Sequence, residues 1–151
     1  MHVELHVFHA AAGVNGDALS GGVAIVAACD LAIASKKARL GNHEATFGVW
    51  PMTSKIPVLG QLSPKKALEH FYTGQPYSAQ EALELGLLNR VVESNELKSA
   101  VKSFAEKVTV ISPELLKLGR QMFYEMVDMG YEEALDLGRE KFVEMFSEKK
   151  N

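Results

Sequence analysis

The amino-acid sequence predicts an α/β fold that continues into a helical C-terminal region. Short apolar segments of strand type alternate with helical segments over the first two thirds of the chain, and amphipathic helices follow. The chain has 151 residues, 47% hydrophobic and 23% charged, which is enough for one globular core. We expect an α/β core over residues 1–111 and a helical region over residues 112–151.

Composition argues against several classes of function. A formal net charge of −3 gives no electrostatic basis for a nucleic-acid partner, and no apolar run approaches the ~20 residues of a membrane span. The single cysteine, Cys29, lies in an apolar run, where we expect a buried thiol in a reducing compartment. The N-terminal residues match neither a signal peptide nor a transit peptide, so we expect a cytoplasmic protein, with the mitochondrial matrix as the alternative.

Apolar runs and glycines predict the first elements of the core. Residues 5–14 alternate loosely and then become apolar, as in a buried strand. Residues 23–29 are apolar on all sides, and we expect a helix there because the run is rich in alanine and Ser20 can cap it. Two further short strands are expected at residues 31–34 and 38–41.

Prolines, glycines and capping residues predict the elements that follow. Residues 42–62 are rich in glycine and proline, which indicates a long loop with short helical pieces, a kind of segment that often carries function. Helices are expected over residues 64–72 and 78–85. The second should begin with a capping box formed by Ser78 and Glu81.

The last third of the chain is predicted to be mainly helical. A strand is expected over residues 87–92, and helices follow from Glu96, with a new start at Ser112 and Pro113. Two apolar stripes recur there with helical spacing, which is typical of a core or a subunit interface. They comprise Leu115, Leu118, Met122 and Met126, and then Leu135, Phe142 and Phe146.

The small-residue turn at Ser20, Gly21 and Gly22 is the first candidate for chemistry. A helix that begins at this turn leaves backbone N–H groups without partners, and its dipole favours an anion or a developing oxyanion. The glycines also permit close packing of strand and helix, which is the alternative interpretation. The turn lacks the lysine of a phosphate-binding loop and the glycine spacing of a G-x-S-x-G nucleophile elbow.

Glu44 is the second candidate. A carboxylate close to Phe47 and Trp50 is expected to be partly desolvated, which would raise its pKa toward the range useful for proton transfer. The alternative is a loop glutamate that caps a short helix. His43 and Glu44 do not form a zinc motif, because no second histidine follows one helical turn later.

A metal site at the N-terminus is not expected either. His2, His6 and His9 lie in a segment of strand type, where His2 and His6 share one face and His9 lies on the other. We therefore expect no metal in this protein.

A set of short motifs occurs along the chain in this order: Asn15-Gly16-x-Ala18-Leu19-x-Gly21-Gly22, Ala28-Cys29-Asp30, Glu44-x-x-x-Gly48, Tyr72-Thr73-Gly74, Ser78-Ala79-x-Glu81-Ala82 and Gly86-Leu87-Leu88-Asn89-Arg90-Val91-Val92. In order and spacing these motifs resemble the enoyl-CoA hydratase/isomerase (crotonase) superfamily, from about Val14 to the C-terminus. The resemblance implies a partial ββα spiral of the crotonase type, without its N-terminal half, followed by a helical oligomerisation region.

The resemblance also implies roles for particular residues. The N–H group of Gly21 would hold the thioester oxygen as enolate charge develops, and Glu44 would act as the acid and base. One oxyanion donor contributes about 2.7–4 kcal/mol in other enzymes. Residues that would contact the substrate are Ala18, Leu19, Phe47, Trp50 and Pro51.

Two departures from the family pattern bear on function. Many hydratases of the family carry a second glutamate where this chain has Ala24, and a single glutamate favours isomerisation of a 3-enoyl-CoA over hydration. The part of the family domain that supplies the second oxyanion N–H group and much of the CoA groove is also expected to be missing. The alternatives are a hydratase of fatty-acid oxidation and a catalytically silent acyl-CoA-binding or assembly subunit.

The resemblance sets the expected partners. The substrate would be an acyl-CoA thioester, with coenzyme A as part of the substrate and no separate cofactor. A homotrimer or hexamer is expected through the helical region, with no nucleic-acid or membrane partner.

Overall fold

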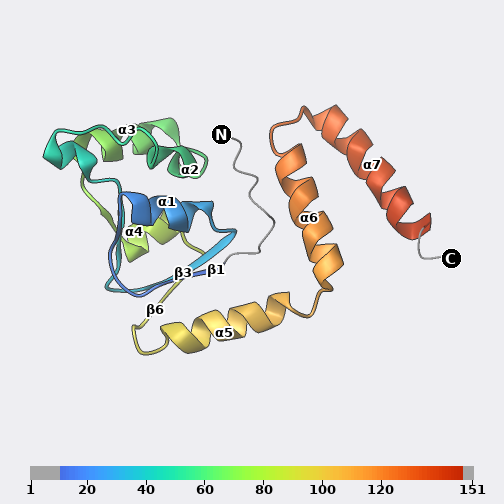
Figure 1. The fold of residues 1–151 in the computed structure, drawn as a ribbon, viewed down its shortest axis with the longest axis horizontal. Coiled ribbons are helices and arrows are strands. Elements are labelled where there is room, and N and C mark those ends of the chain that lie inside the picture. Colours follow the sequence, from blue (N-terminus) through green and yellow to red (C-terminus); the bar gives the residue numbers. More distant parts are fainter. Residues whose placement is uncertain (1–10, 148–151) are drawn as a thin grey trace. The chain divides into compact units, whose positions relative to one another are not determined.

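A computed structural model describes residues 11–147 of the chain (Figure 1). The chain divides into two compact units, Met1–Val108 and Thr109–Asn151, and each is described by itself. The first unit holds the strands and the helices that pack on them, and the second holds two helices. All of the candidate site residues lie in the first unit.

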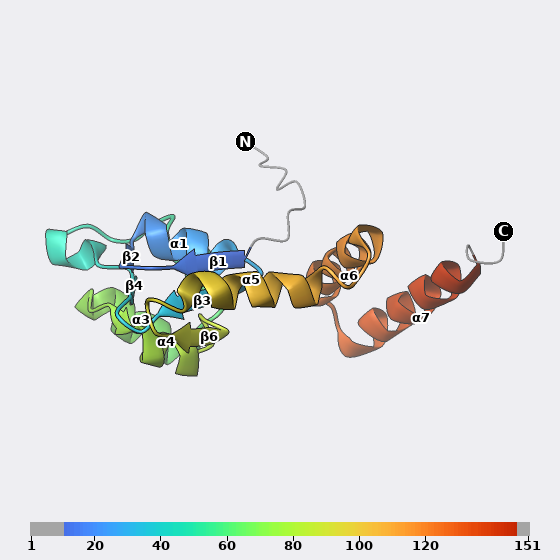
Figure 2. The ribbon, with the colours of Figure 1, turned by 90° about the horizontal axis from the view of Figure 1, so that it is seen from below.

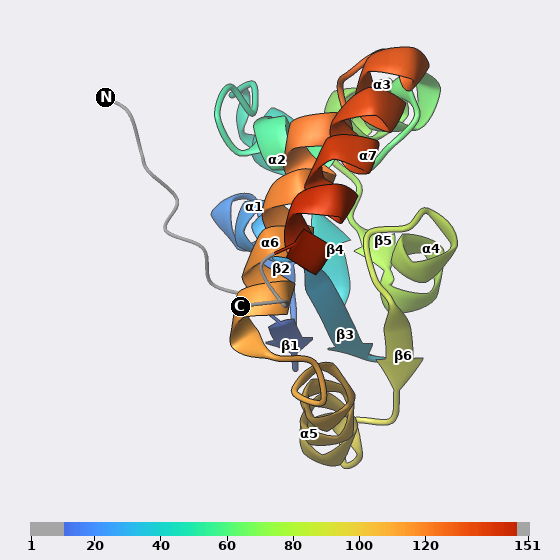
Figure 3. The same cartoon turned by 90° about the vertical axis from the view of Figure 1, so that its right-hand side faces the viewer.

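Three parallel strands form the first sheet, in the order β1-β3-β6 (Figure 3). They are β1 (Ala11–Val14), β3 (Leu31–Ser35) and β6 (Arg90–Val92). Ala12 lies opposite Ala32, and Ile33 lies opposite Arg90. Strand β3 is central and mostly buried, which explains its continuous apolar sequence. Helix α5 (Leu97–Val108) packs against β1 and β3 (Figure 2).

A second small sheet places the functional segments next to each other. Its order is β2-β4-β5, with β2 (Ala18–Leu19), β4 (Arg39–Gly41) and β5 (Tyr77–Ser78). Strands β2 and β4 are parallel, and β5 is antiparallel to β4. The sequence pattern did not predict β2 or β5, because a strand of two residues has no readable periodicity.

Helix α1 (Gly21–Ala28) is apolar all round, but only one face of it is buried, and Ile25 on the other face is 69% exposed. It buries Val23, Val26 and Ala27 and packs against the short helix α2 (Lys55–Leu59). Ser20 occupies the N-cap position, but the expected capping bond is wrong: its side chain makes no hydrogen bond to the helix. The reason is its backbone, which has a φ of 53° and a ψ of −112°.

The long loop contains the short helical pieces that were expected, a 3₁₀ turn η1 (Glu44–Phe47) and α2. Helix α3 (Pro64–Thr73) follows and contacts both of them. Gly74 ends α3 with a φ of 62°, a conformation that favours glycine, and Thr46 of η1 fills the space beside it. The loop is thereby held against α3.

Helix α4 (Ala79–Glu84) begins with the expected capping box, in which Ser78 and Glu81 bond each other's backbone N–H groups. It packs against β4, β5 and β6. One continuous apolar core fills the unit between these helices and the strands. Its larger buried members are Val14, Val23, Val26, Leu40, Val58, Leu62, Phe71, Leu87 and Leu88.

The second unit consists of α6 (Pro113–Met126) and α7 (Tyr131–Ser147). Ser112 caps α6 as expected, since its hydroxyl accepts a hydrogen bond from the N–H group of Leu115. No residue in the range 109–147 is buried. The two predicted apolar stripes are therefore not a core of this chain, and the interpretation as a subunit interface stays a prediction.

No helix among the described residues combines the length and the apolar character that a membrane span requires.

The backbone at Ser20 generates the first prediction. Among the described residues it is the only one other than glycine with a positive φ. Replacing Ser20 by Gly or by Ala removes the same hydroxyl, but only glycine accepts this φ without strain. We expect Ser20→Gly to exceed Ser20→Ala by about 1–2 kcal/mol in the free energy of unfolding, measured by urea denaturation. Equal stabilities would contradict the backbone conformation described.

Candidate active site

Two segments meet at the end of the second sheet. The pairing of β2 with β4 sets Leu19 beside Gly41, and the N–H group of Ser20 donates to the carbonyl of Gly41 at 2.8 Å. One residue beyond Leu19 and two beyond Gly41, the Ser20 Oγ lies 2.9 Å from Nδ1 of His43. The turn that begins α1 and the segment that carries Glu44 therefore leave the same end of one pair of parallel strands.

Gly21 presents a free backbone donor at this place. As the first residue of α1, its N–H group has no partner inside the helix. Gly21 is exposed, and an added Cβ would meet no atom within 4 Å. The amide is therefore open to an approaching ligand oxygen, and the positive end of the helix dipole lies with it.

The two oxygens of the Glu44 carboxylate have different surroundings. Oε1 accepts hydrogen bonds from the Ser54 hydroxyl at 2.5 Å and from the Asn42 side-chain amide at 3.3 Å. Oε2 is buried and has no hydrogen-bond partner among the described residues. Asn42 in turn donates to the Ser54 hydroxyl at 2.8 Å, which fixes both donors. One oxygen is thus held in place while the other is left to exchange a proton.

The raised pKa expected for Glu44 is wrong. Partial burial does raise the pKa of this carboxyl, and it is the largest single influence. Hydrogen bonds from Ser54, from the backbone, from Asn42 and from Ser20 outweigh it together, and the pKa of Glu44 is lowered. The sequence pattern showed the apolar neighbours but not the donors, which come from residues two, ten and twenty-four positions away. The carboxylate is therefore ionised at neutral pH.

His70 anchors the segment that carries Glu44. Its Nε2 accepts from the N–H group of Asn42 at 2.7 Å, and its Nδ1 donates to the carbonyl of Gln75 at 2.9 Å. This pair of bonds assigns the proton to Nδ1 and requires a neutral ring. Burial lowers the pKa of His70, which favours that neutral form. A Cβ at Gly41 would lie 2.3 Å from Cε1 of His70, so only glycine fits beside the ring.

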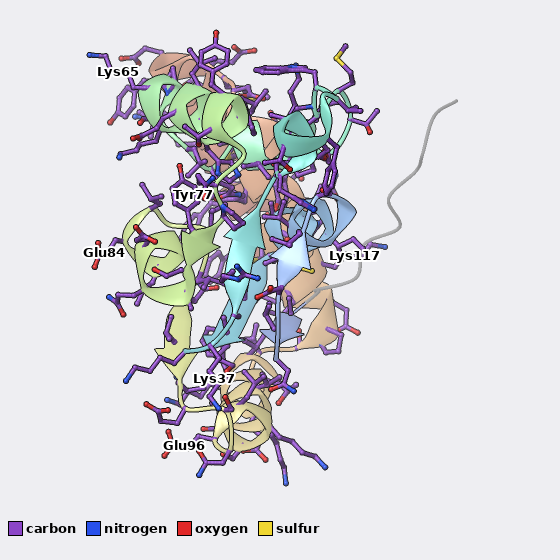
Figure 4. The ribbon with its side chains drawn as sticks, turned by 90° about the vertical axis from the view of Figure 1, so that its left-hand side faces the viewer. Lys37, Lys65, Tyr77, Glu84, Glu96 and Lys117 are labelled. Atoms are coloured by element: carbon purple, nitrogen blue, oxygen red, sulfur yellow. The ribbon has the colours of Figure 1, made fainter. Side chains whose placement is uncertain are left out.

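Tyr77 completes this support. Its ring stacks on His70 with the centroids 4.6 Å apart, and its hydroxyl donates to the carbonyl of Lys66 at 3.0 Å. Figure 4 shows Tyr77 at the junction of α3 and α4. Sequence reasoning missed His70, although its place on the buried face of α3, beside Ala67 and Phe71, was a usable signal.

The residues expected to contact the substrate are dispersed. Ala18 is buried and Leu19 half-buried within β2. Phe47 is 72% exposed and lies edge-to-face with His43, with ring centroids 5.1 Å apart. Pro51 is buried.

Trp50 lies at a separate apolar cavity of about 310 Å³. Its ring packs against Phe71 and Tyr72, with centroid distances of 6.1 and 5.6 Å. Lys55 Nζ lies 5.6 Å from the centre of the same ring. The cavity is lined by Trp50, Lys55, Leu59, Leu62, Pro64, Ala67, Leu68 and Phe71. Phe47 and Pro51 are not among these lining residues in the described part of the chain.

The remaining candidate residues are possible metal ligands and the cysteine. Residues 11–147 contain no group of three His, Cys, Asp or Glu side chains arranged to hold a metal ion. His2, His6 and His9 lie outside the described residues. Cys29 is half-buried rather than buried, and desolvation, with a smaller contribution from Asp30, raises the pKa of its thiol.

Comparisons with known proteins identify the family of this chain. Residues 6–151 match the family model described as enoyl-CoA hydratase/isomerase. The chain is 37% identical over 120 residues to human enoyl-CoA hydratase domain-containing protein 3, mitochondrial, which is 80% of this chain and 40% of the relative. It is 40% identical over 113 residues to a short-chain-enoyl-CoA hydratase of Clostridium acetobutylicum, which is 73% of this chain and 42% of the relative.

Solved structures show the same fold. The crystal structure of human enoyl coenzyme A hydratase domain-containing protein 3 superposes with a TM-score of 0.85 at 34% identity, over 89% of this chain and 53% of that chain. The chain thus spans about two fifths of the length of these two curated relatives, and the fold it shows is part of a crotonase domain.

The hydrogen bonds to Glu44 generate a prediction about its titration. Replacing Ser54 by Ala removes a donor to the ionised carboxylate, so the pKa of Glu44 should rise. Carboxyl ¹³C NMR titration measures this directly. Ser63→Ala is the matched control, because Ser63 precedes α3 without a side-chain capping bond and should leave the Glu44 pKa as it is. A Glu44 pKa that is unchanged or lower in Ser54→Ala would refute the assigned network.

The neutral ring of His70 generates a prediction about stability. Because its folded pKa is lowered, the unfolded chain binds a proton that the native state does not, and stability falls as the pH drops below about 6.5. The loss for one group approaches at most about 1.4 kcal/mol per pH unit. Glutamine offers a donor and an acceptor but does not titrate. Urea unfolding of His70→Gln between pH 7.5 and 5 should show a smaller decline than the original chain, and an identical decline would exclude this role.

Proposed function

Because this chain belongs to the enoyl-CoA hydratase/isomerase family, we propose that it shuttles a proton on an enoyl-CoA thioester. The observation that carries the proposal is the position of the Glu44 carboxylate, which has one hydrogen-bonded oxygen and one without a partner among the described residues. It lies at the same strand ends as the free amide of Gly21. The first group moves a proton and the second stabilises the charge that the proton leaves behind.

The proposed reaction begins with polarisation of the thioester carbonyl by the N–H group of Gly21. Charge that develops on this oxygen makes the adjacent carbon acidic, and one preorganised donor contributes about 2.7–4 kcal/mol in other enzymes. Oε2 of Glu44 removes the proton from C2 and returns it at C4, while Oε1 stays bonded to Ser54 and Asn42. A carboxylate with a lowered pKa is fully ionised but is a weak base, so the reaction depends strongly on the oxyanion donor.

Isomerisation of a 3-enoyl-CoA is the form of this chemistry that the residues favour. Ala24, half-buried on α1, has no proton to give, whereas hydration needs a group that holds and activates water in addition to Glu44. The 40% identity to a protein named short-chain-enoyl-CoA hydratase favours hydration as the second candidate.

The proposed partners follow from this chemistry. A proton shuttle needs no metal or redox cofactor, and coenzyme A enters as part of the substrate. Exposed apolar side chains of α6 and α7 support a homotrimer or hexamer, which light scattering after size-exclusion chromatography would measure. They include Leu115, Leu135, Phe142 and Phe146. The human relative is named mitochondrial, which supports the matrix alternative to the cytoplasm.

Turnover tests the proposal. Purified protein is given a 3-enoyl-CoA and, separately, a 2-enoyl-CoA, and absorbance of the conjugated enoyl thioester is followed. We expect the signal to rise on the first substrate as the double bond moves into conjugation. Hydration would lower the signal on the second substrate, and we expect this fall to be at least about 100-fold slower than the rise, or absent. A falling signal on the 2-enoyl-CoA alone would assign a hydratase. No change on either would assign a silent binding subunit.

Glu44→Gln should reduce the isomerisation rate by about 100-fold or more, because the amide cannot accept the proton. Acyl-CoA binding, measured by titration calorimetry, should persist. Glu84→Gln is the matched control, since Glu84 is an exposed residue at the end of α4, whereas Glu44 lies in η1. Glu84 is labelled in Figure 4. Full activity of Glu44→Gln would overturn the assignment of the base.

A further inference from the structure

Ser20 and His43 form a pair of groups that the proposed proton shuttle does not use. The Ser20 hydroxyl makes no capping bond to α1 and instead lies 2.9 Å from Nδ1 of His43. The same hydroxyl also contributes a hydrogen bond to Glu44, and for it to donate to His43 instead, His43 must carry its proton on Nε2 and leave Nδ1 as the acceptor. A serine hydroxyl within hydrogen-bond reach of a neutral imidazole is the combination that activates a nucleophile.

The pair is accessible to a ligand. Ser20 and His43 are each half-buried, and Gly21 next to them is exposed with open space where a side chain would be. Ser20 therefore stands at the surface where the free amide of Gly21 is presented. A carbonyl oxygen that approached this amide would bring its carbon near the Ser20 hydroxyl.

The backbone follows the order found in a nucleophile elbow. Strand β2 ends at Leu19, Ser20 turns with a φ of 53°, and α1 begins at once with Gly21. In a nucleophile elbow the serine stands on such a sharp strand-to-helix turn, and the N–H group of the next residue forms part of the oxyanion hole. The glycine spacing differs from G-x-S-x-G, which is why the sequence pattern argued against this arrangement.

From this geometry we propose that Ser20, with His43 as its base, is the nucleophile of a second activity, the hydrolysis of acyl-CoA thioesters. The inference rests on the proposed function to the extent that both need the thioester carbonyl at Gly21. Its bond-forming step uses neither Glu44 as a base nor a double bond in the acyl chain. Saturated acyl-CoA thioesters can be neither isomerised nor hydrated, so release of coenzyme A from them reports this activity alone.

The reaction has two balanced steps. Ser20 Oγ forms a bond to the carbonyl carbon while its proton passes to Nδ1 of His43, and the Gly21 amide holds the resulting oxyanion. The carbon–sulfur bond then breaks, and the coenzyme A thiolate takes the proton from His43, which leaves an ester on Ser20. In the second step a water molecule gives a proton to Nδ1, its oxygen bonds to the carbonyl carbon, and Ser20 Oγ departs with that proton. The products are a carboxylic acid and free coenzyme A.

The strained backbone fits this role. A residue other than glycine is strained at such a φ, and glycine would remove the strain at this position. A serine there has a hydroxyl that the helix does not use for capping. The hydroxyl lies 2.9 Å from Nδ1 of His43 and also contributes a hydrogen bond to Glu44.

Thiol release from butanoyl-CoA tests the proposal. Free coenzyme A is measured with a thiol reagent against a protein-only blank, which corrects for Cys29. We expect steady release by the original chain and a loss of at least about 100-fold in Ser20→Ala, which keeps the backbone and removes only the hydroxyl. Glu84→Gln is the control expected to match the original chain.

A covalent probe gives a second readout that does not depend on acyl-CoA turnover. A small fluorophosphonate should add one phosphonyl group to the intact protein, and peptide mapping should place it on Ser20. His43→Gln should slow the labelling, because the base is lost, while the fold is monitored by circular dichroism. Labelling at another serine, or equal labelling of Ser20→Ala, would overturn the proposal.

The outcomes separate this activity from the proton shuttle. Binding of butanoyl-CoA without thiol release would refute the Ser20 nucleophile and leave the proposed isomerase intact. Thiol release without isomerisation of a 3-enoyl-CoA would support Ser20 and refute the proposed role of Glu44. A chain that binds no acyl-CoA at all would contradict both.

Discussion

The parallel pairing of β2 with β4 is the constraint on which the site depends. Two residue pairs and the bond from the Ser20 amide to the Gly41 carbonyl set the register of these strands. A shift of one residue would turn each side chain to the opposite face, and Ser20 would no longer meet His43. A very short ladder thus brings together a helix N-terminus and a carboxylate that are more than twenty residues apart in the sequence.

A short ladder holds only because neighbouring elements support it. His70 fills the space beside Gly41 and accepts from the Asn42 amide, and Tyr77 from β5 covers its ring. Burial of a neutral, fully bonded imidazole gives this support without a buried charge. The Asn42 side chain in turn bonds Ser54, and both residues donate hydrogen bonds to Glu44. The contacts that hold this loop in place therefore also lower the pKa of the Glu44 carboxyl.

Elements with standard capping residues or a continuous apolar pattern could be predicted from the sequence. Local sequence patterns predict the capping box at Ser78, the cap at Ser112 and the buried strand β3. Gly21 and Glu44 could be singled out from the sequence as candidates, and their segments leave the same end of the paired strands β2 and β4. The Glu44 pKa, the support by His70 and the direction of the Ser20 hydroxyl could not be predicted, because each depends on contacts between residues distant in sequence.

The central claim is that Gly21 and Glu44 act on one bound thioester. Proton NMR of butanoyl-CoA in deuterated water measures it most directly, since exchange at the carbon next to the carbonyl needs an oxyanion donor and a base together. The account predicts that the protein accelerates loss of the C2 proton signal. Binding of butanoyl-CoA with exchange no faster than in buffer would contradict it.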